Sequence, residues 1–263
     1  YSSSNYGHDI DFSAVGNVLL NGFISTSGHS FSGGSTQVVS NGGNVTIVAG
    51  GYVKVGGGIT VSGGSNTHSS YSWNENSNGG WVSITGGGGV TLASTITTWN
   101  GASGSVGYGV NGTITISSGN STATSGSGSG VNDGQVSGLL QGGDFIKSGV
   151  GVFVMKGSNT YTGATSVSGG VLRLGSGNSI PVGSALSVVG TLDLGGFSQT
   201  VRTLSGGGLV TSSGSGSLVL TVSDGGETTT YSGVIENGSA GSVGITKTGS
   251  GTLILSGSST YTG

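Results

Sequence analysis

A stretch of seventeen residues occurs twice in this chain, in copies one hundred positions apart. The first copy occupies residues 147–163 (KSGVGVFVMKGSNTYTG) and the second occupies residues 247–263 (KTGSGTLILSGSSTYTG). A segment that recurs in register is typical of units that stack on copies of themselves, so the duplication predicts a repeat architecture. We assign structural roles to the recurring positions Lys147, Gly149, Gly151, Tyr161, Gly163, Lys247, Gly249, Gly251, Tyr261 and Gly263.

A shorter repeat lies in the first hundred residues. It consists of short apolar runs at Ile10–Phe12, Val18–Leu20 and Ile24–Thr26, and runs with the same spacing of 8 and 6 residues recur from Val45 and from Val82. Alternation with period 2 points the outer residues of a run one way and the middle residue the other way, as in a β-strand. The pattern therefore predicts inward ladders of Val, Ile and Leu, with Thr, Ser, Asp and Lys facing water.

Glycine and asparagine between these runs predict the corners of a turning chain. Gly50, Gly51, Asn17 and residues 86–89 lie there, and we expect them to provide corners of positive φ, which glycine adopts at little cost. Short strands at fixed intervals, joined by such corners, predict an all-β fold of the parallel β-solenoid type. Successive turns of such a solenoid lie about 4.8 Å apart.

The glycine content also raises the alternative of a disordered chain, since Gly accounts for 61 of the 263 residues and charged residues for 6%. Disorder requires low hydrophobicity and high net charge, whereas this chain is 32% hydrophobic with a net charge of −3. A helical fold is disfavoured because glycine and β-branched residues destabilise helix interiors, and no stripe with a period of 3.6 residues is present. The composition therefore favours ordered strands.

A Gly- and Ser-rich run at residues 117–130 has the composition of a linker. We predict two sections, residues 1–130 and residues 131–263, the second of which contains the unit of about 100 residues and a truncated second copy of it. Within the first section, the polar residues 66–81 lack alternation and predict a loop that projects from the stack.

Four aromatic residues in and after this polar segment are candidate contacts for a glycan or another partner: Tyr71, Trp73, Trp81 and Trp99. Exposed rings can stack on sugars, and loops on rigid scaffolds often carry binding residues. The alternative is that the rings fold back and cover apolar surface, as large aromatic side chains usually do. The sequence leaves both interpretations open.

The carboxy-terminal section resembles a known family. Residues 151–180 (GVFVMKGSNTYTGATSVSGGVLRLGSGNSI) are similar to the autotransporter-associated β-strand repeat, also called the passenger-associated transport repeat. Residues 190–211 resemble the segment that commonly follows this repeat, and residues 249–263 resemble the start of the next one. The amino-terminal section resembles, less closely, the repeats of filamentous-haemagglutinin-type adhesins. Both resemblances imply right-handed parallel β-helices on the surface of Gram-negative bacteria, and we expect the chain to be a piece of a longer protein.

Residues that carry chemistry are sparse in this sequence. Because it contains no Cys, disulfides and Cys-based metal or nucleophile sites are excluded. His8 lies beside Asp9 and Asp11, but no G-x-S-x-G motif occurs, and the nine acidic residues are scattered. We predict no enzyme activity, no cofactor and no metal site. The alternative is a polysaccharide-acting enzyme, because a solenoid can align carboxylates from successive turns for acid–base work.

The charge and the length of the apolar runs limit the partners. A net charge of −3 argues against nucleic acid, and no apolar run is long enough for insertion into a membrane. We predict an extracellular or cell-surface structural or adhesive protein, a rigid stalk or fibre segment that mediates adhesion, aggregation or biofilm formation. The expected partners are copies of itself, further repeats of the same chain, and surface or matrix polysaccharide. A glycan-binding adhesin that uses the loop aromatics is a further alternative.

Overall fold

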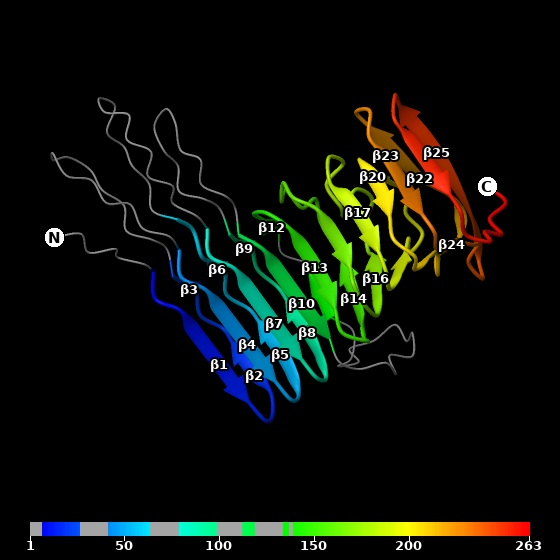
Figure 1. Cartoon of the computed structure of the whole chain (residues 1–263). Coiled ribbons are helices and arrows are strands. Elements are labelled where there is room, and N and C mark those ends of the chain that lie inside the picture. Colours follow the sequence, from blue (N-terminus) through cyan, green and yellow to red (C-terminus); the bar gives the residue numbers. More distant parts are fainter. Residues whose placement is uncertain (1–6, 27–41, 64–78, 99–111, 119–133, 137–138) are drawn as a thin grey trace, which may run out of the picture.

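The computed structural model describes residues 7–26, 42–63, 79–98, 112–118, 134–136 and 139–263. In these residues every regular element is a strand, and every strand pairing is parallel. The strands form sheets that stack in an elongated array (Figure 1). The all-β prediction is confirmed, and the stacked parallel sheets fit a β-solenoid.

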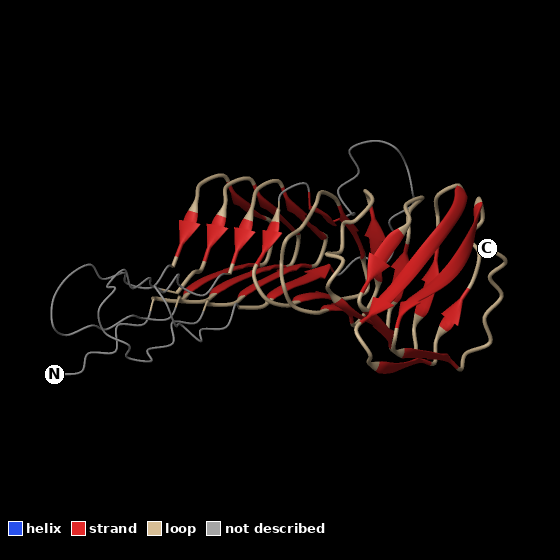
Figure 2. Ribbon diagram, turned by 90° about the horizontal axis from the view of Figure 1, so that it is seen from above, coloured by secondary structure: helices blue, strands red, loops and turns tan. Residues whose placement is uncertain are grey.

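Three sheets, which we call A, B and C, begin in the amino-terminal turns, and each of the first four turns adds one strand to each of them (Figure 2). Sheet A contains, in spatial order, β1 (Ile10–Ala14), β4 (Val45–Ala49), β7 (Val82–Gly86), β10 (Ile114–Ser118), β13 (Phe145–Ser148), β15 (Thr165–Val167), β17 (Ala185–Val188) and β20 (Thr203–Ser205). Sheet B contains β2 (Val18–Leu20), β5 (Tyr52–Val55), β8 (Gly89–Leu92), β11 (Gly134–Val136), β14 (Val152–Met155), β16 (Val171–Leu174), β18 (Thr191–Asp193), β21 (Leu209–Thr211) and β24 (Val234–Ile235). Sheet C contains β3 (Ile24–Ser25), β6 (Ile59–Thr60), β9 (Ile96–Thr97) and β12 (Leu140–Gln141).

The carboxy-terminal turns use two further sheets, D and E. Sheet D contains β19 (Gln199–Val201), β22 (Gly216–Asp224) and β25 (Gly241–Gly249), and sheet E contains β23 (Thr228–Tyr231) and β26 (Thr252–Leu255). Sheet A is linked to sheet E by a parallel bridge between Gly206 and Tyr231. The two copies of the duplicated stretch therefore lie in different sheets, the first in A and B and the second in D and E.

The spacing of the short amino-terminal repeat sets the register in which the strands of sheets A, B and C pair. In sheet A, Ile10 pairs with Val45, Val45 with Val82, and Val82 with Ile114. The rows in sheets B and C are Val18–Val53–Val90 and Ile24–Ile59–Ile96. From the second turn onward these side chains are buried in one continuous core. The predicted inward ladders are present, because alternation places every second residue of a strand on the same face.

The glycine corners work differently from our prediction. Among Gly50, Gly51 and residues 86–89, only Gly89 has a positive φ, 127°. The expectation of positive φ is wrong for the others, which meet a different constraint: a Cβ atom at Gly50 would collide with the carbonyl oxygen of Val15. Turns stacked about 4.8 Å apart leave no room for a side chain between the corners.

A ladder of glycines shows the same constraint in the carboxy-terminal section. A Cβ atom at Gly190 would collide with the carbonyl oxygen of Gly170, and one at Gly208 with that of Gly190. The series continues with Gly233 above Gly208 and Gly257 above Gly233. Glycine is required here because backbone approaches backbone in every turn.

Side-chain oxygens tie neighbouring turns together at other corners. Asn17, for which we also expected positive φ, instead accepts a hydrogen bond from the Tyr52 N–H through Oδ1, at 2.9 Å. Asp9 accepts the Asn44 N–H at 2.7 Å, and Asn44 accepts the Trp81 N–H at 3.0 Å. These bonds satisfy backbone donors that the short strands leave unpaired.

The division near residue 130 stays a prediction. Residues 119–133 lie outside the described part of the chain, as do residues 66–78 of the predicted loop. On either side of residues 119–133, β10 pairs with both β7 and β13, and β11 pairs with both β8 and β14. Sheets A and B therefore continue from the amino-terminal section into the carboxy-terminal one.

Candidate functional site

The duplicated stretch begins with a lysine that is placed in two different settings. Lys147 lies in β13 of sheet A and is fully buried. Its ammonium group donates to the carbonyl oxygens of Ser148 at 2.6 Å, Gly149 at 3.1 Å and Gly169 at 3.1 Å, the last of these in the next turn. Burial lowers the pKa of Lys147 to about 8. Carbonyl dipoles thus take the place of a carboxylate counter-ion.

Lys247 repeats part of this arrangement in β25. Its ammonium group donates to the carbonyl oxygens of Thr248 at 2.6 Å and Gly249 at 3.3 Å, and it pairs with Oδ2 of Asp224 at 2.7 Å. Oδ1 of Asp224 accepts the Gly251 N–H at 2.6 Å. The hydrogen bond from Lys247 outweighs burial and holds the pKa of the Asp224 carboxyl below its usual value. In both copies the lysine joins its own corner to a neighbouring turn.

The glycine that follows this lysine has the same conformation in both copies. Gly149 has a φ of 72° and Gly249 a φ of 80°, a left-handed conformation in which a Cβ atom is strained. Among the other recurring glycines, a Cβ atom at Gly163 would collide with Oδ1 of Asp144. One at Gly251 would collide with the carbonyl oxygen of Glu227.

The end of the stretch connects each copy to the turn before it. Oδ1 of Asn159 accepts the Leu140 N–H at 2.9 Å, and Oγ of Ser259, its counterpart, accepts the Ile235 N–H at 3.1 Å. Tyr161 is buried, and its hydroxyl group shares a hydrogen bond of 2.5 Å with Oγ1 of Thr165. Burial raises the pKa of Tyr161 well above its ordinary value. The contacts of both copies are made within the stack.

Three aromatic rings in and next to the first copy pack against one another in the core. The ring of Phe145 lies 6.1 Å from that of Phe153 and 5.9 Å from that of Tyr161, measured between centroids. All three side chains are buried. Tyr261 also packs against the core, but it is only partly buried.

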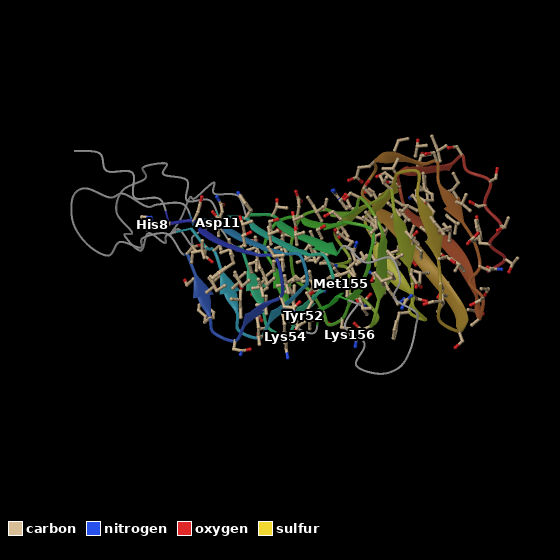
Figure 3. The ribbon with its side chains drawn as sticks, turned by 90° about the horizontal axis from the view of Figure 1, so that it is seen from below. His8, Asp11, Tyr52, Lys54, Met155 and Lys156 are labelled. Carbon is tan, nitrogen blue, oxygen red and sulfur yellow. The ribbon has the colours of Figure 1, made fainter. Side chains whose placement is uncertain are left out.

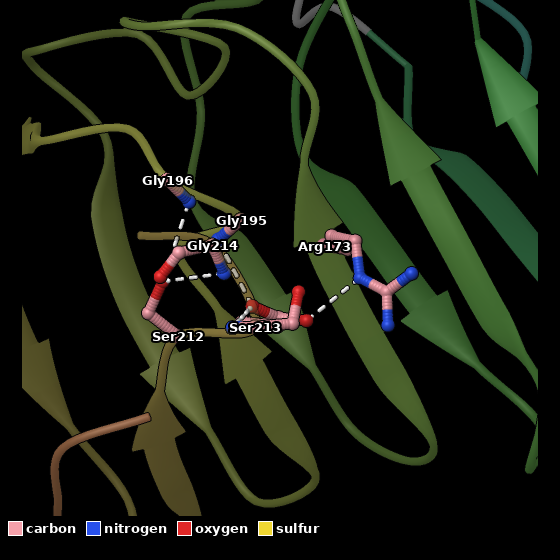
Figure 4. A network of polar contacts seen from close by, with 7 residues as sticks. Arg173, Gly195, Gly196, Ser212, Ser213 and Gly214 are labelled. Atoms are coloured by element: carbon pink, nitrogen blue, oxygen red, sulfur yellow. Dashed lines mark hydrogen bonds and ion pairs between the residues drawn. The ribbon is translucent and has the colours of Figure 1, made fainter. Parts of the chain in front are cut away.

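A charged row on sheet B was missed by the sequence reasoning. Arg173 on β16 pairs in register with Asp193 on β18, and its Nε donates to Oδ2 of Asp193 at 2.7 Å (Figure 4). Oδ1 of Asp193 accepts the N–H groups of Gly195 at 2.9 Å and Ser213 at 2.7 Å. Burial alone would raise the pKa of this carboxyl, but the hydrogen bonds from Ser213, Arg173 and Gly195 hold it below its usual value. The network joins three successive turns.

Of the four candidate aromatic residues, Trp81 lies in the described part of the chain, whereas Tyr71, Trp73 and Trp99 lie outside it. Trp81 directly precedes β7 and is 43% exposed. Its carbonyl oxygen accepts the Val45 N–H at 3.0 Å. Because Val82 is buried and Ser83 is not, alternation puts Trp81 on the outer face of sheet A.

His8 and Asp9, which we weighed for catalysis together with Asp11, directly precede β1, and Asp11 lies in that strand. His8 and Asp11 are exposed at the amino-terminal end of the stack (Figure 3), and Asp9 accepts a backbone N–H. Among the described residues, no group of three or more His, Cys, Asp or Glu side chains could hold a metal ion. In the same part of the chain, no helix is long and apolar enough to cross a membrane.

Parallel turns tied together by a recurring Lys, Gly and Tyr stretch define the class of repeat proteins built from stacked parallel β-strands. The family model described as passenger-associated-transport-repeat matches residues 145–174 and 245–263. These ranges contain the whole of the duplicated stretch in both copies. The chain thus carries the repeat of autotransporter passengers, and the resemblance of the carboxy-terminal section to that repeat is confirmed. The resemblance of the amino-terminal section to filamentous-haemagglutinin-type repeats stays a prediction.

A curated relative agrees with this class. The chain is 39% identical over 125 residues to the Adhesin BmaC autotransporter of Brucella suis biovar 1 (strain 1330). The match covers 44% of this chain and 4% of that protein, so the chain spans a small part of its relative's length. No solved structure matches the chain.

Proposed function

We propose that this chain is a rigid, non-enzymatic segment of an adhesive passenger outside a bacterial cell. The observation that carries the proposal is the unbroken order of sheets A and B, to which the described turns add strands from Ile10 to Ile235. Each turn contacts only its neighbours, so the stack acts as a stiff spacer. The similarity to an autotransporter adhesin supports a location at the cell surface and an adhesive role.

We further propose that the solenoid is right-handed. The proposal rests on a general rule: connections between parallel strands of one sheet are right-handed in about 98% of cases, because the right-handed twist of the strands favours a right-handed connection. The resemblance to passenger repeats points the same way.

The competing function is an enzyme that acts on polysaccharide, which would need carboxylates close together and available to substrate. Two buried carboxylates are already engaged: Asp193 bonds Arg173 and two backbone N–H groups, and Asp224 bonds Lys247 and Gly251. These contacts favour a structural use of acidic residues.

We also propose association between copies, or with further repeats, as the basis of aggregation or biofilm formation. Leu255 occupies the repeat position of the fully buried Met155 and is 36% exposed, and its neighbour Ile254 is 45% exposed. Strand β26 therefore presents apolar side chains, and exposed sheet edges pair readily with other strands.

Adhesion can be tested with beads that carry the purified chain. We expect them to bind host cells or bacterial surfaces above the level of beads coated with an unrelated protein. A chain with Leu172→Asp, which puts a charge at a fully buried position, should lose both the fold and the binding. Binding at the background level would overturn the adhesive proposal. Release of sugar fragments from polysaccharide by the intact chain would favour the enzyme.

A further inference from the structure

We propose that the outer face of sheet A around Trp81 is a binding site for an uncharged polysaccharide. The inference rests on the adhesive function proposed above and names its ligand. The Trp81 face consists of Trp81 and the outward residues of three neighbouring strands: Thr46 and Val48 of β4, Ser83 and Thr85 of β7, and Thr115 and Ser117 of β10.

The ring of Trp81 is exposed, but the backbone that carries it is held on both sides. The N–H donates to Oδ1 of Asn44 at 3.0 Å, the carbonyl oxygen accepts the Val45 N–H at 3.0 Å, and the next residue, Val82, is 1% exposed. A large apolar side chain that is 43% exposed on so fixed a backbone can bind a ligand with little loss of backbone entropy.

Apart from Val48, the residues around the ring are hydrogen-bonding groups in register. Thr46 pairs with Ser83 and Ser83 with Thr115, and in the next row Thr85 pairs with Ser117. The rows therefore run along the stack, with a step of about 4.8 Å per turn. Each hydroxyl group can both donate and accept, as the hydroxyl groups of a sugar do. A flat aromatic ring with polar groups at its rim suits a pyranose ring, whose C–H face stacks while its hydroxyl groups bond.

The charges near this face favour a neutral ligand. None of the outward residues that define the face is charged, and at its edge the exposed carboxylate of Asp11, which pairs in register with Thr46, would repel an acidic ligand. In the row of Trp81 itself, Asp9 and Asp144 lie two turns away on either side, and each accepts a backbone N–H, from Asn44 and Ala164. An acidic polysaccharide would need Lys or Arg side chains at the site. A protein partner would favour a larger apolar centre than one indole ring.

Binding can be measured by fluorescence titration of the full chain with three neutral polysaccharides, namely dextran, galactomannan and hydroxyethylcellulose, and with acidic alginate. We expect at least one neutral polysaccharide to bind. Trp81→Ala should weaken that binding by about tenfold or more, and Trp81→Phe should retain most of it. Val189→Ala, which truncates a side chain 63% exposed at a distant corner, is the matched control.

A second pair of variants tests the face while keeping the ring. Ser83→Glu adds a charge beside Trp81 and should weaken binding, whereas Ser187→Glu lies four strands along the same row and should not. Circular dichroism checks that each variant is folded.

The site is overturned if no neutral polysaccharide binds, if alginate alone binds, or if Trp81→Ala binds like the wild type. If beads carrying Trp81→Ala still adhere to cells, the glycan site is overturned but the adhesive function stands. If wild-type beads do not adhere, the adhesive function itself is overturned.

Discussion

The ammonium group of Lys147 donates to the carbonyl oxygen of Gly169 at 3.1 Å, across the boundary between two turns. A buried cation thus closes a corner of the stack by using carbonyl dipoles alone. Its counterpart Lys247 uses the carboxylate of Asp224 in a neighbouring turn. The same sequence position therefore carries an uncompensated charge in one copy and an ion pair in the other.

The uncompensated charge predicts that the free energy of unfolding rises between pH 8 and pH 10. Burial lowers the pKa of Lys147 from 10.5 to about 8, so in this interval the folded state has released the proton that the unfolded state still holds. The rise should be about 2 kcal/mol in total, with a slope of at most about 1.4 kcal/mol per pH unit. Urea unfolding at a series of pH values measures it.

The matched variants for this prediction are Lys147→Met and Lys54→Met, the second at an exposed lysine. The slope should be absent in Lys147→Met and unchanged in Lys54→Met. The series ends at pH 10, because burial raises the pKa of Tyr231 from 10.0 to about 12, and ionisation in the unfolded state then lowers stability. An equal slope in both variants would show that another group is responsible.

The glycine ladder predicts a position-dependent cost for alanine. Gly208→Ala should destabilise the fold by about 1–3 kcal/mol, because its Cβ atom would collide with the carbonyl oxygen of Gly190 and the stacked backbone has no space to yield. Gly183→Ala is the control, since no atom lies within 4 Å of a Cβ built there. Thermal unfolding compares the two variants; similar losses would mean that close stacking is not the reason for glycine.

The strands of the amino-terminal turns could be predicted from the sequence because burial repeats every second residue. Ile10, Val45 and Val82 lie in one row, as their spacing indicates. The corner glycines could not be explained in the same way, since their constraint comes from the turn above or below. The different sheets that Lys147 and Lys247 join could not be predicted either, because the two copies of the stretch are closely similar in sequence.

The candidate sites were predictable in part. Alternation counted back from Val82 and Ile84 already puts Trp81 on the outer face of a strand. This signal was missed because Trp81 lies at the end of the polar residues 66–81, which predict a loop. The pairing of Arg173 with Asp193 depends on a turn of twenty residues, and Gly/Ser-rich corners leave the length of a turn undefined. Such pairs can be found only once the register is known.

The Asp193 network predicts a large effect of removing one carboxylate. Asp193→Ala should cost about 2–4 kcal/mol, because Arg173 and the N–H groups of Gly195 and Ser213 lose their acceptor. Asp11→Ala, at an exposed carboxylate, should change stability by less than about 0.5 kcal/mol. Chemical denaturation at pH 7 measures both variants.

Acid should remove the same stabilisation. The pKa of Asp193 is lowered in the folded state from an ordinary value of 3.8, so its contribution is present above pH 4 and is lost as the pH falls through the folded pKa. The difference between the wild type and Asp193→Asn should therefore shrink below pH 4. A difference that stays constant down to pH 2 would contradict the assigned hydrogen bonds.

The two copies of the repeat should respond differently to the same truncation. Met155→Ala should cost about 2–5 kcal/mol, because Met155 is fully buried, whereas Leu255→Ala should cost well under half as much at a side chain 36% exposed. Thermal unfolding of the purified chain gives both values. Equal losses would indicate that the outer strand β26 is covered in solution, which favours association between copies.

The central claim, parallel turns in register, is tested most directly by engineered disulfides, because the chain has no cysteine of its own. Thr46 and Ser83 pair directly across β4 and β7, whereas Thr46 and Thr85 are two residues out of register. Adjacent strands lie within the Cα separation that a disulfide tolerates. Thr46→Cys with Ser83→Cys should therefore oxidise readily, and Thr46→Cys with Thr85→Cys should not. Preferential oxidation of the second pair, or equal oxidation of both, would contradict the stacking register.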